Sequence, residues 1–332
     1  MSAPGTALVI GATGGIGGSV AEALLDRGWQ VRALTRDPQR AAALLADRPG
    51  IEWVAGDAMD KPAVIAAARG VGLILHGANP PRYRNWRGLA IPMLDHSIAA
   101  AQASGALLVL PGTLYNFGPD AGPVVDERAP QHPLTRKGAV RVEMEQALER
   151  AAETGLRSLV VRAGDYFGPS APSSWFQMAL VKPGRPIRAV TYPGSREIGH
   201  SWAYLPDLAE TILRLAEVEH RLAPFEIVHF GGHWLERGIE IAESVRHVAG
   251  RPLPIRNFPW PLLTLGAPFV PLFREILEMR HLWREPLRLD NRKLIGLIGA
   301  EPQTPLDAAV RISLAGLGCL RREEETASWL AT

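Results

Sequence analysis

Cysteine is nearly absent from the sequence, in which Cys319 is the only one among 332 residues. A single thiol excludes an internal disulfide and a zinc site built from cysteines, and it is typical of a reducing compartment, so a cytoplasmic location is expected. An excess of charge of one sign is also absent, because 36 Lys and Arg residues face 34 Asp and Glu residues. This balance argues against a polyanionic partner, and no nucleic acid is expected to bind.

Long apolar runs are scarce. The longest, residues 258–273, contains four prolines and is shorter than the roughly 20 residues of a membrane-spanning helix. Two interpretations stay open: internal packing or a lid on the substrate side, and contact with a membrane or a second copy of the chain. The first is favoured, and no membrane partner is expected. The chain also enters the strand-like residues 6–10 without the basic and apolar regions of an export signal.

Signatures of two other enzyme classes are missing. The sequence has no G-x-S-x-G motif, so a hydrolase of the α/β type would lack its nucleophile. The nine histidines are scattered, and the closest pair, His229 and His233, has no carboxylate at ligand spacing. No metal site is therefore expected.

An alternation of short apolar runs with longer helical patterns extends to about residue 165, which is typical of a parallel sheet built from βαβ units. Six strands are predicted, at residues 6–10, 31–35, 52–55, 73–76, 107–110 and 158–162. Ile16, Val20 and Leu24 form the apolar stripe of the first helix between them. Right-handed crossovers then give an α/β fold with a doubly wound parallel sheet of the Rossmann type.

A change of pattern near residue 165 predicts two parts. Residues 1–165 are expected to form a dinucleotide-binding domain, to which segments within about 202–230 return as a helix and a strand. Residues 166–332 are irregular and proline-rich, and they are expected to form a smaller substrate-binding part interleaved with the first.

A glycine-rich loop follows the first strand and opens a helix, with Gly11, Gly14 and Gly17 in a G-x-x-G-x-x-G pattern. Glycines allow a tight turn and a close approach of a pyrophosphate, and the helix N-terminus offers free N–H groups to it. A tight turn without a ligand is the alternative, but strand, loop and helix in this order favour dinucleotide binding. The loop residues expected to bind the cofactor are Gly11, Thr13, Gly14, Gly15, Ile16 and Gly17.

The end of the second strand indicates which dinucleotide binds. An NAD site usually places Asp or Glu there, on the ribose 2′-hydroxyl. Here Arg36 comes first, and its planar guanidinium suits a 2′-phosphate, with Arg40 as a second cation. Asp37 keeps NAD open, although we expect it to cap the helix that begins near Pro38. NADP, as NADPH, is therefore favoured over NAD.

With these residues in place, the chain resembles the extended short-chain dehydrogenase/reductase superfamily, which contains NAD(P)-dependent epimerases, dehydratases and reductases. The resemblance covers nearly the whole length and includes two further segments, residues 161–169 and 289–299. It implies cofactor contacts after the third and fourth strands, at Asp57, Ala58, Gly77 and Ala78. It also implies a homodimer formed through the fourth and fifth helices.

The catalytic residues of that superfamily are a Ser or Thr, a Tyr and a Lys, the last two spaced Y-x-x-x-K on one helix. At the matching positions this sequence has Pro111, Lys137 and Arg141. Thr113 and Tyr115 lie nearby in sequence and could supply a hydroxyl. The helix is also similar to that of isoflavone-reductase-like reductases, in which a lysine takes the proton-transfer role.

Two cations at the head of an apolar stripe, Lys137 and Arg141, need a partner. One interpretation is an anionic cofactor or substrate; the other is a first turn that protrudes into water, with Arg141 paired to Glu145. As an ammonium, Lys137 could polarise a carbonyl or donate a proton, so reduction is favoured over oxidation. Lys137, Arg141, Thr113 and Tyr115 are the catalytic candidates, and Lys137 is also a cofactor-binding candidate.

Aromatic and charged residues supply the substrate candidates. Tyr83 and Trp86 follow the fourth strand, where ligands collect in such sheets. Asp165, Trp175 and Arg196 are candidates from the second part, although many such residues belong only to a core. The sequence thus predicts an NADP(H)-dependent oxidoreductase, in the reducing direction, that acts on a small carbonyl or related substrate.

Two alternatives to that function stay open. The replaced catalytic positions fit a catalytically silent NAD(P)-binding sensor or regulatory protein. The wider superfamily also suggests a nucleotide-sugar epimerase or dehydratase, which the missing tyrosine makes harder to support.

Overall fold

The computed structural model describes residues 5–45, 50–80, 85–172 and 174–320, and its centre is a seven-stranded sheet in the order β11-β7-β5-β4-β1-β2-β3. Every neighbouring pair in the sheet is parallel. The strands are β1 (Thr6–Ile10), β2 (Gln30–Thr35), β3 (Ile51–Ala55), β4 (Leu73–His76), β5 (Leu107–Thr113), β7 (Ser158–Ala163) and β11 (Phe225–His229). This arrangement confirms the predicted doubly wound α/β fold.

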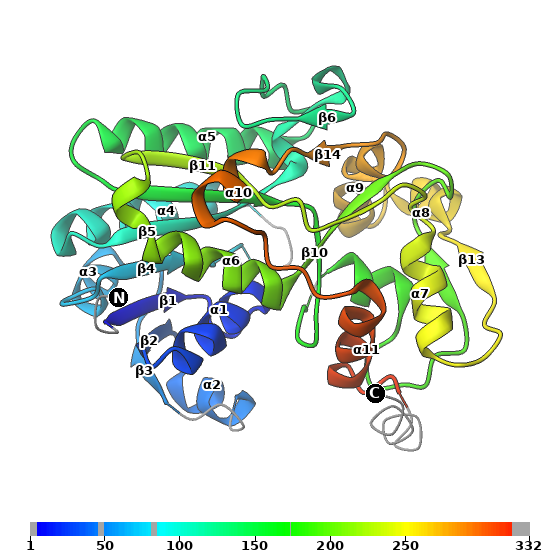
Figure 1. Cartoon of the computed structure of the whole chain (residues 1–332), viewed down its shortest axis with the longest axis horizontal. Helices are drawn as coiled ribbons and strands as arrows, with labels where there is room; N and C mark the ends of the chain where they lie inside the picture. The colour runs from blue at the N-terminus through cyan, green and yellow to red at the C-terminus, as the bar shows by residue number, and fades with distance from the viewer. Residues whose placement is uncertain (1–4, 46–49, 81–84, 173, 321–332) are drawn as a thin grey trace.

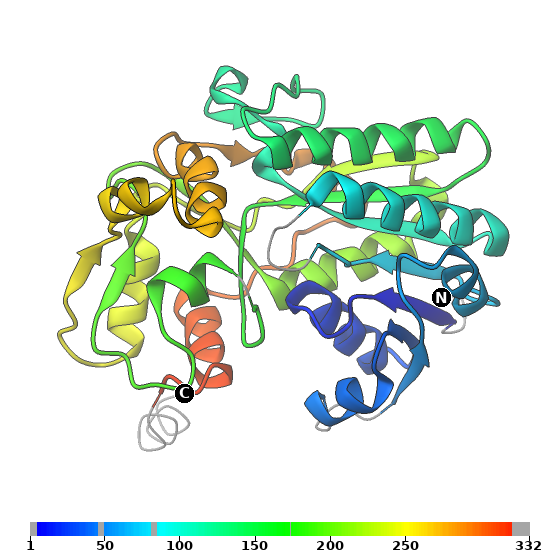
Figure 2. The same cartoon turned by 180° about the vertical axis from the view of Figure 1, so that it is seen from behind.

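Helices cover both faces of the sheet (Figures 1 and 2). Residues of α1 and α6 share one buried apolar cluster with the sheet, and residues of α3, α4 and α5 share another. The sheet helices are α1 (Gly15–Asp26), α2 (Pro38–Leu44), α3 (Lys61–Ala67), α4 (Trp86–Ser104), α5 (Arg136–Ala152), α6 (Leu205–Glu217) and α10 (Arg292–Ile298). Because both faces are buried, the strands have continuous apolar runs rather than alternating ones.

The six predicted strands all form, and the helix and strand expected within residues 202–230 are α6 and β11. The largest difference is β5, which runs three residues further than predicted, to Thr113. The extension contains Pro111 and Gly112, which disfavour a strand, yet Pro111 to Thr113 pair in register with β7. Tertiary pairing therefore overrides local propensity where β5 reaches the candidate site.

The remaining elements lie mostly to one side of the sheet, around an aromatic-rich core (Figure 1). The strands are β6 (Val124–Val125), β8 (Asp165–Phe167), β9 (Val190–Tyr192), β10 (His200–Tyr204), β12 (His233–Leu235), β13 (Ile255–Asn257) and β14 (Arg288–Leu289). The α-helices are α7 (Glu240–Val248), α8 (Trp260–Gly266), α9 (Pro271–Glu278) and α11 (Leu306–Gly316). Short helices are η2 (Leu114–Asn116), η3 (Pro119–Ala121), η4 (Phe176–Leu180), η5 (Glu219–Arg221) and η6 (Arg280–Trp283).

The apolar run at residues 258–273 forms α8 and the beginning of α9. Trp260 is buried in the aromatic-rich core and Leu263 is also buried, as internal packing predicts, but Leu265 and Phe269 are 76% and 85% exposed. The run is therefore only half internal. None of the helices within the described residues combines the length and apolar character that a membrane crossing requires.

Candidate active site

The glycine loop lies at the carboxyl end of β1, next to the end of β4. A Cβ on Gly17 would lie 2.2 Å from the carbonyl oxygen of Gly11, and a Cβ on Gly11 would lie 2.7 Å from that of Gly77. Gly11 also has a φ of +93°, a left-handed conformation that favours glycine. The chain leaves β1 and returns at β4 on its other side, which makes this the switch point where ligands bind in open α/β sheets.

Helix α1 begins directly behind this loop, with Gly14 as its N-cap and no side chain capping its first N–H groups. Such an N-terminus attracts the phosphates of a nucleotide. Thr13 is exposed and Gly11, Gly14, Gly15 and Ile16 are half-buried, so the loop is open to a ligand. The fit of a dinucleotide rests on this close packing of the loop, in which side chains at Gly11 and Gly17 would collide with backbone, and on the uncapped N–H groups of α1.

The ends of β2 and β3 lie side by side, because Gly56 N donates to the carbonyl of Thr35 at 2.9 Å. Arg36 and Arg40 are exposed after β2, and Asp57 is half-buried after β3. Asp37 caps α2 as predicted, since its carboxylate accepts from Arg40 N at 2.9 Å. The structure thus brings Arg36, Arg40 and Asp57, which are predicted to contact the adenosine half of the cofactor, to one edge of the sheet.

Lys137 lies in the first turn of α5 and is only 3% exposed. Its Nζ lies 2.7 Å from Oε2 of Glu275 and 3.9 Å from Oε2 of Glu278, and it donates to the backbone carbonyl of Glu275 at 3.1 Å. Both carboxylates belong to α9, which lies beside the start of α5 (Figures 1 and 2). The alternative of a first turn that protrudes into water is therefore wrong, and two protein carboxylates pair with the lysine.

Arg141 is also buried, one turn further along α5. It donates to the carbonyl of Pro111 at 3.2 Å and to Oδ1 of Asn79 at 2.9 Å, and its guanidinium lies 5.2 Å from the ring centre of Trp86. The cation therefore joins the ends of β4 and β5 to the start of α4. Of the two substrate candidates after β4, Trp86 lies in this cluster, and Tyr83 lies outside the described residues.

Glu145 does not serve as the predicted partner of Arg141, because its carboxylate is held by Arg162 at 2.6 and 3.1 Å. Arg162 is fully buried on β7 and also donates to Nε2 of His229 at 3.1 Å, and His229 in turn donates from Nδ1 to the carbonyl of Val125 at 3.2 Å. Sequence reasoning missed this network. The signal was Arg162 itself, a charged residue inside an apolar strand, which requires a buried counterion.

The two hydroxyl candidates lie close to α5. The Thr113 hydroxyl accepts from Tyr115 N at 3.2 Å and so caps η2. The backbone of η2 packs tightly on α5, since a Cβ on Gly138 would lie 2.1 Å from the carbonyl oxygen of Tyr115. Tyr115 is therefore on the short helix that contacts the first turn of α5, and Thr113 caps that helix from the end of β5.

The substrate candidates of the second part have partners among the elements beside the aromatic-rich core. Asp165 accepts from His200 Nε2 at 2.8 Å, and His200 stacks on Trp283. Trp175 is buried and makes edge contact with Trp283. Arg196 is exposed and donates to the carbonyl of Ile255 at 3.2 Å. Trp175 is thus part of the aromatic core in this structure, and a substrate role for Asp165 and Arg196 stays a prediction.

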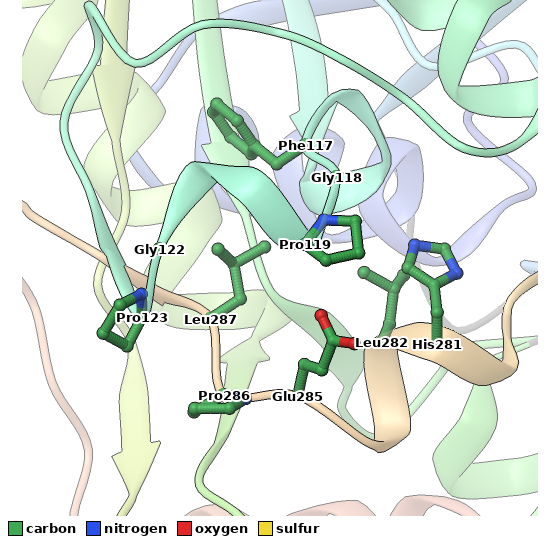
Figure 3. Close-up of a pocket in the computed structure, with 10 residues that line it drawn as sticks. All are labelled: Phe117, Gly118, Pro119, Gly122, Pro123, His281, Leu282, Glu285, Pro286 and Leu287. Atoms are coloured by element: carbon green, nitrogen blue, oxygen red, sulfur yellow. The ribbon is translucent and has the colours of Figure 1, made fainter.

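Two cavities were not indicated by the sequence. One of about 330 Å³ is mostly apolar and lies between the residues around η3 and those of η6 and the segment after it, with His281 and Glu285 as its polar side chains (Figure 3). The other, of about 530 Å³, is bordered by four exposed cations, Lys182, Arg185, Arg188 and Arg256. Neither contains a residue predicted for the site.

Burial shifts the pKa values of two titratable groups near Arg141. Desolvation, with the charge of Arg141 second, lowers the pKa of His76 to about 3, and its Nδ1 shares a hydrogen bond of 2.8 Å with Ser97. Desolvation raises the pKa of Tyr166 to about 12, and its hydroxyl donates to the carbonyl of Gly112 at 2.9 Å. Both groups are neutral at pH 7, so Lys137 and Arg141 supply the positive charge of this cluster.

Comparison of the sequence with known proteins gives two partial matches. Residues 4–84 match the model of the NmrA-like family. A 3-diazoavenalumate denitrifying reductase from a Streptomyces species is 36% identical over 177 residues, which are 49% of this chain and 56% of the relative. The match thus spans about half of the curated relative.

Solved structures resemble the chain over almost its full length. A UDP-glucose-4-epimerase from Stenotrophomonas maltophila with bound NAD and formylated UDP-arabinopyranose has a TM-score of 0.72 at 16% identity, covering 98% of this chain and 99% of the other. The UDP-Glc/GlcNAc 4-epimerase of Campylobacter jejuni has a TM-score of 0.70 at 15% identity, with 94% and 98% covered. The Bordetella bronchiseptica enzyme WbmH, in complex with NAD+, has a TM-score of 0.66 at 19% identity, with 94% and 98% covered. The chain therefore has the fold of these epimerases, and its residues 4–84 match the NmrA-like family.

Proposed function

We propose that the chain is an NADP(H)-dependent reductase that acts on a small carbonyl or related substrate. The observation that carries the proposal is the cradle at the β1–β4 switch point, where side chains at Gly11 or Gly17 would collide with backbone and where the N–H groups of α1 have no capping side chain. A nicotinamide cofactor is also what solved structures of this fold hold, by their descriptions. Gly11, Gly14, Gly17, Asp57 and Gly77 would hold the dinucleotide.

The residues after β2 favour NADP. Arg36 and Arg40 are exposed there, and neither forms an ion pair with a carboxylate in the described part of the chain. Asp37, which an NAD site would direct to the ribose, uses its carboxylate to cap α2. Two cations and an engaged carboxylate suit a 2′-phosphate better than a 2′-hydroxyl.

A bound NADPH would supply the hydride for the reduction. Lys137, at the position that the superfamily gives to its tyrosine, would donate the proton to the developing alkoxide. Arg141, held by Pro111 and Asn79 beside Trp86, would orient a substrate that has an anionic or aromatic group. A homodimer formed through α4 and α5 remains part of the proposal.

A fluorescence titration with NADPH and NADH tests the cofactor. We expect NADPH to bind more tightly than NADH, and Arg36→Ala to weaken NADPH binding about tenfold or more, because it removes a charge-assisted bidentate contact. Arg246→Ala, an exposed arginine on α7, is the matched control and should change neither affinity. Failure of both nucleotides to bind below about millimolar, a very weak affinity, would overturn the proposal.

A second candidate reaction is the reductive removal of a diazo group, and two observations favour it. The Streptomyces relative is named as a reductase of 3-diazoavenalumate. In this chain no tyrosine occupies the usual proton-donor position, where Lys137 is instead enclosed by Glu275 and Glu278. Transfer of hydride to an arenediazonium carbon releases dinitrogen and leaves the arene, and this step consumes no proton.

Lys137→Met separates the two reactions. In carbonyl reduction we expect it to lower kcat by about 10²-fold or more, the usual contribution of a positioned general acid, with NADPH affinity retained. In reduction of a diazo arene acid the same variant should stay within a few-fold of wild type, because no proton is needed. A wild-type protein that binds NADPH but reduces neither class of compound would favour the sensor alternative.

A further inference from the structure

The pairing of Lys137 with α9 links a buried ammonium to a carboxylate that reaches water. Lys137 is 3% exposed, whereas the side chain of Glu275 is 35% exposed, and their charged atoms are 2.7 Å apart. The two residues are 138 positions apart in the sequence, so only the tertiary fold brings them together. A partly exposed carboxylate in contact with a buried ammonium is arranged to carry protons between that ammonium and solvent.

We propose that Glu275 is the positioning residue and proton route of Lys137, connecting its buried ammonium to solvent. The proposal rests on the proposed function, in which Lys137 donates one proton for each product formed. After that donation Nζ is a neutral amine with little direct access to water. Glu275 would then take a proton from water or a buffer acid and pass it to Nζ, which restores the ammonium and the carboxylate.

Over one cycle of this route, the protein neither gains nor loses a proton. One proton leaves Nζ for the substrate oxygen, one proton enters the Glu275 carboxyl from solvent, and the same proton moves on to Nζ. No bond other than N–H and O–H bonds changes in these steps. Glu275 also accepts a hydrogen bond from Nζ at its backbone carbonyl, which fixes the direction of the ammonium while the side chain exchanges protons.

Glu278 is less suited to this role, although it lies on the same helix. Its Oε2 is 3.9 Å from Nζ, beyond hydrogen-bond reach, and its Oε1 accepts a hydrogen bond from the backbone N–H of Arg136. It is therefore held at the N-terminus of α5, where a carboxylate is favoured. Glu278 fixes α9 on α5, and Glu275 is left to exchange protons.

Proton exchange of the Lys137 ammonium with water tests the route without any substrate or cofactor. The chain has four lysines, so each ammonium can be followed in ¹⁵N-lysine-labelled protein by NMR; they are Lys61, Lys137, Lys182 and Lys293. If Glu275 carries protons, Glu275→Gln should slow the exchange of Lys137 about tenfold or more. Arg274→Gln, an exposed neighbour on α9, is the matched control and should leave it unchanged.

The sign of the effect distinguishes a proton route from a merely structural ion pair. Loss of a structural ion pair would loosen α9 and speed the exchange, so an equal or faster rate in Glu275→Gln overturns the proposal. Circular dichroism of each variant reports whether the fold is intact. Lys293 pairs with Glu226 and is the internal control for a lysine with a carboxylate partner.

Turnover gives the second readout. With a carbonyl substrate of the wild type, Glu275→Gln should lower kcat about tenfold or more at unchanged NADPH affinity, and acetate in the buffer should restore the rate. For Glu275→Gln, the isotope effect of deuterated water on kcat should rise, and the isotope effect of deuterated NADPH on kcat should fall. If Glu275→Gln retains wild-type activity, or loses activity that acetate does not restore, the proton route is refuted. The proposed function is not affected by either result. A wild type that reduces no carbonyl refutes the proposed function, whereas the exchange of Lys137 in Glu275→Gln decides the proton route.

Discussion

At the scale of single residues, the most consequential feature is the charge that the fold buries. Arg162 has no exposed surface, and its guanidinium is matched by the Glu145 carboxylate, which also accepts from Asn116 at 2.9 Å and from Gln131 at 3.2 Å. A buried pair of this kind contributes little against an apolar pair of the same shape, but loss of one partner leaves an uncompensated charge in the interior. The pair fixes α5 on β7, and α5 carries two of the four catalytic candidates, Lys137 and Arg141.

We therefore expect Glu145→Ala to lower the free energy of unfolding by about 3–5 kcal/mol, as for other broken buried pairs. Urea denaturation followed by circular dichroism measures the change. Glu217→Ala removes a half-exposed partner of Arg27 and should cost less than about 1 kcal/mol. Equal losses in the two variants would show that the buried charge is not what stabilises α5.

At the scale of elements, the candidate site depends on how closely α1 approaches the ends of β1 and β4. The first turn of α1 contacts the loop backbone at Gly17, and no side chain fits between them. This contact brings the N-terminus of α1 to the edge of the sheet, where a phosphate would bind.

Gly17→Ala should push α1 away from the loop and lower NADPH affinity about tenfold or more, since overpacking of about 1–3 kcal/mol falls on the binding element. Fluorescence titration gives the affinity, and thermal unfolding shows how much of the cost falls on the fold. Gly72→Ala is the control, because a Cβ there meets no atom within 4 Å. Wild-type affinity in Gly17→Ala would contradict the proposed position of the cofactor.

At the scale of the whole molecule, the fold keeps histidines neutral in its interior. Burial, with Arg162 second, lowers the pKa of His229 to about 3, and burial with Arg141 second does the same for His76. In the unfolded chain both would titrate near 6.5. Between about pH 6.5 and 3 the unfolded chain thus binds protons that the folded chain does not, so acid favours unfolding.

The contribution of the two histidines to the free energy of unfolding should be complete above about pH 6.5. Below that pH the free energy of unfolding should fall by up to about 1.4 kcal/mol per pH unit for each histidine. The free energy of unfolding at pH 7.5, 6.0 and 5.0 measures this slope. His229→Gln should reduce it by about half, whereas His220→Gln, at an exposed position, should not. An unchanged slope in His229→Gln would mean that other groups cause the acid sensitivity.

The sequence by itself determined the sheet and its glycine-rich loop. Continuous apolar strands, helical stripes and the glycines at Gly11, Gly14 and Gly17 act over a few residues, so they can be recognised without a structure. The cap at Asp37 was predictable for the same reason. Chain order and crossover handedness then allowed few topologies.

Only the tertiary structure decided which charges meet at the site. Lys137 is held by Glu275 and Glu278 from α9, far along the chain, and Glu145 is held by Arg162 rather than by Arg141 one turn away. Sequence spacing gives the neighbours on one helix, but a buried charge is matched by whichever element packs over it. That choice depends on how α9 docks on α5, because the desolvation of each charge must be offset by a partner within hydrogen-bond reach.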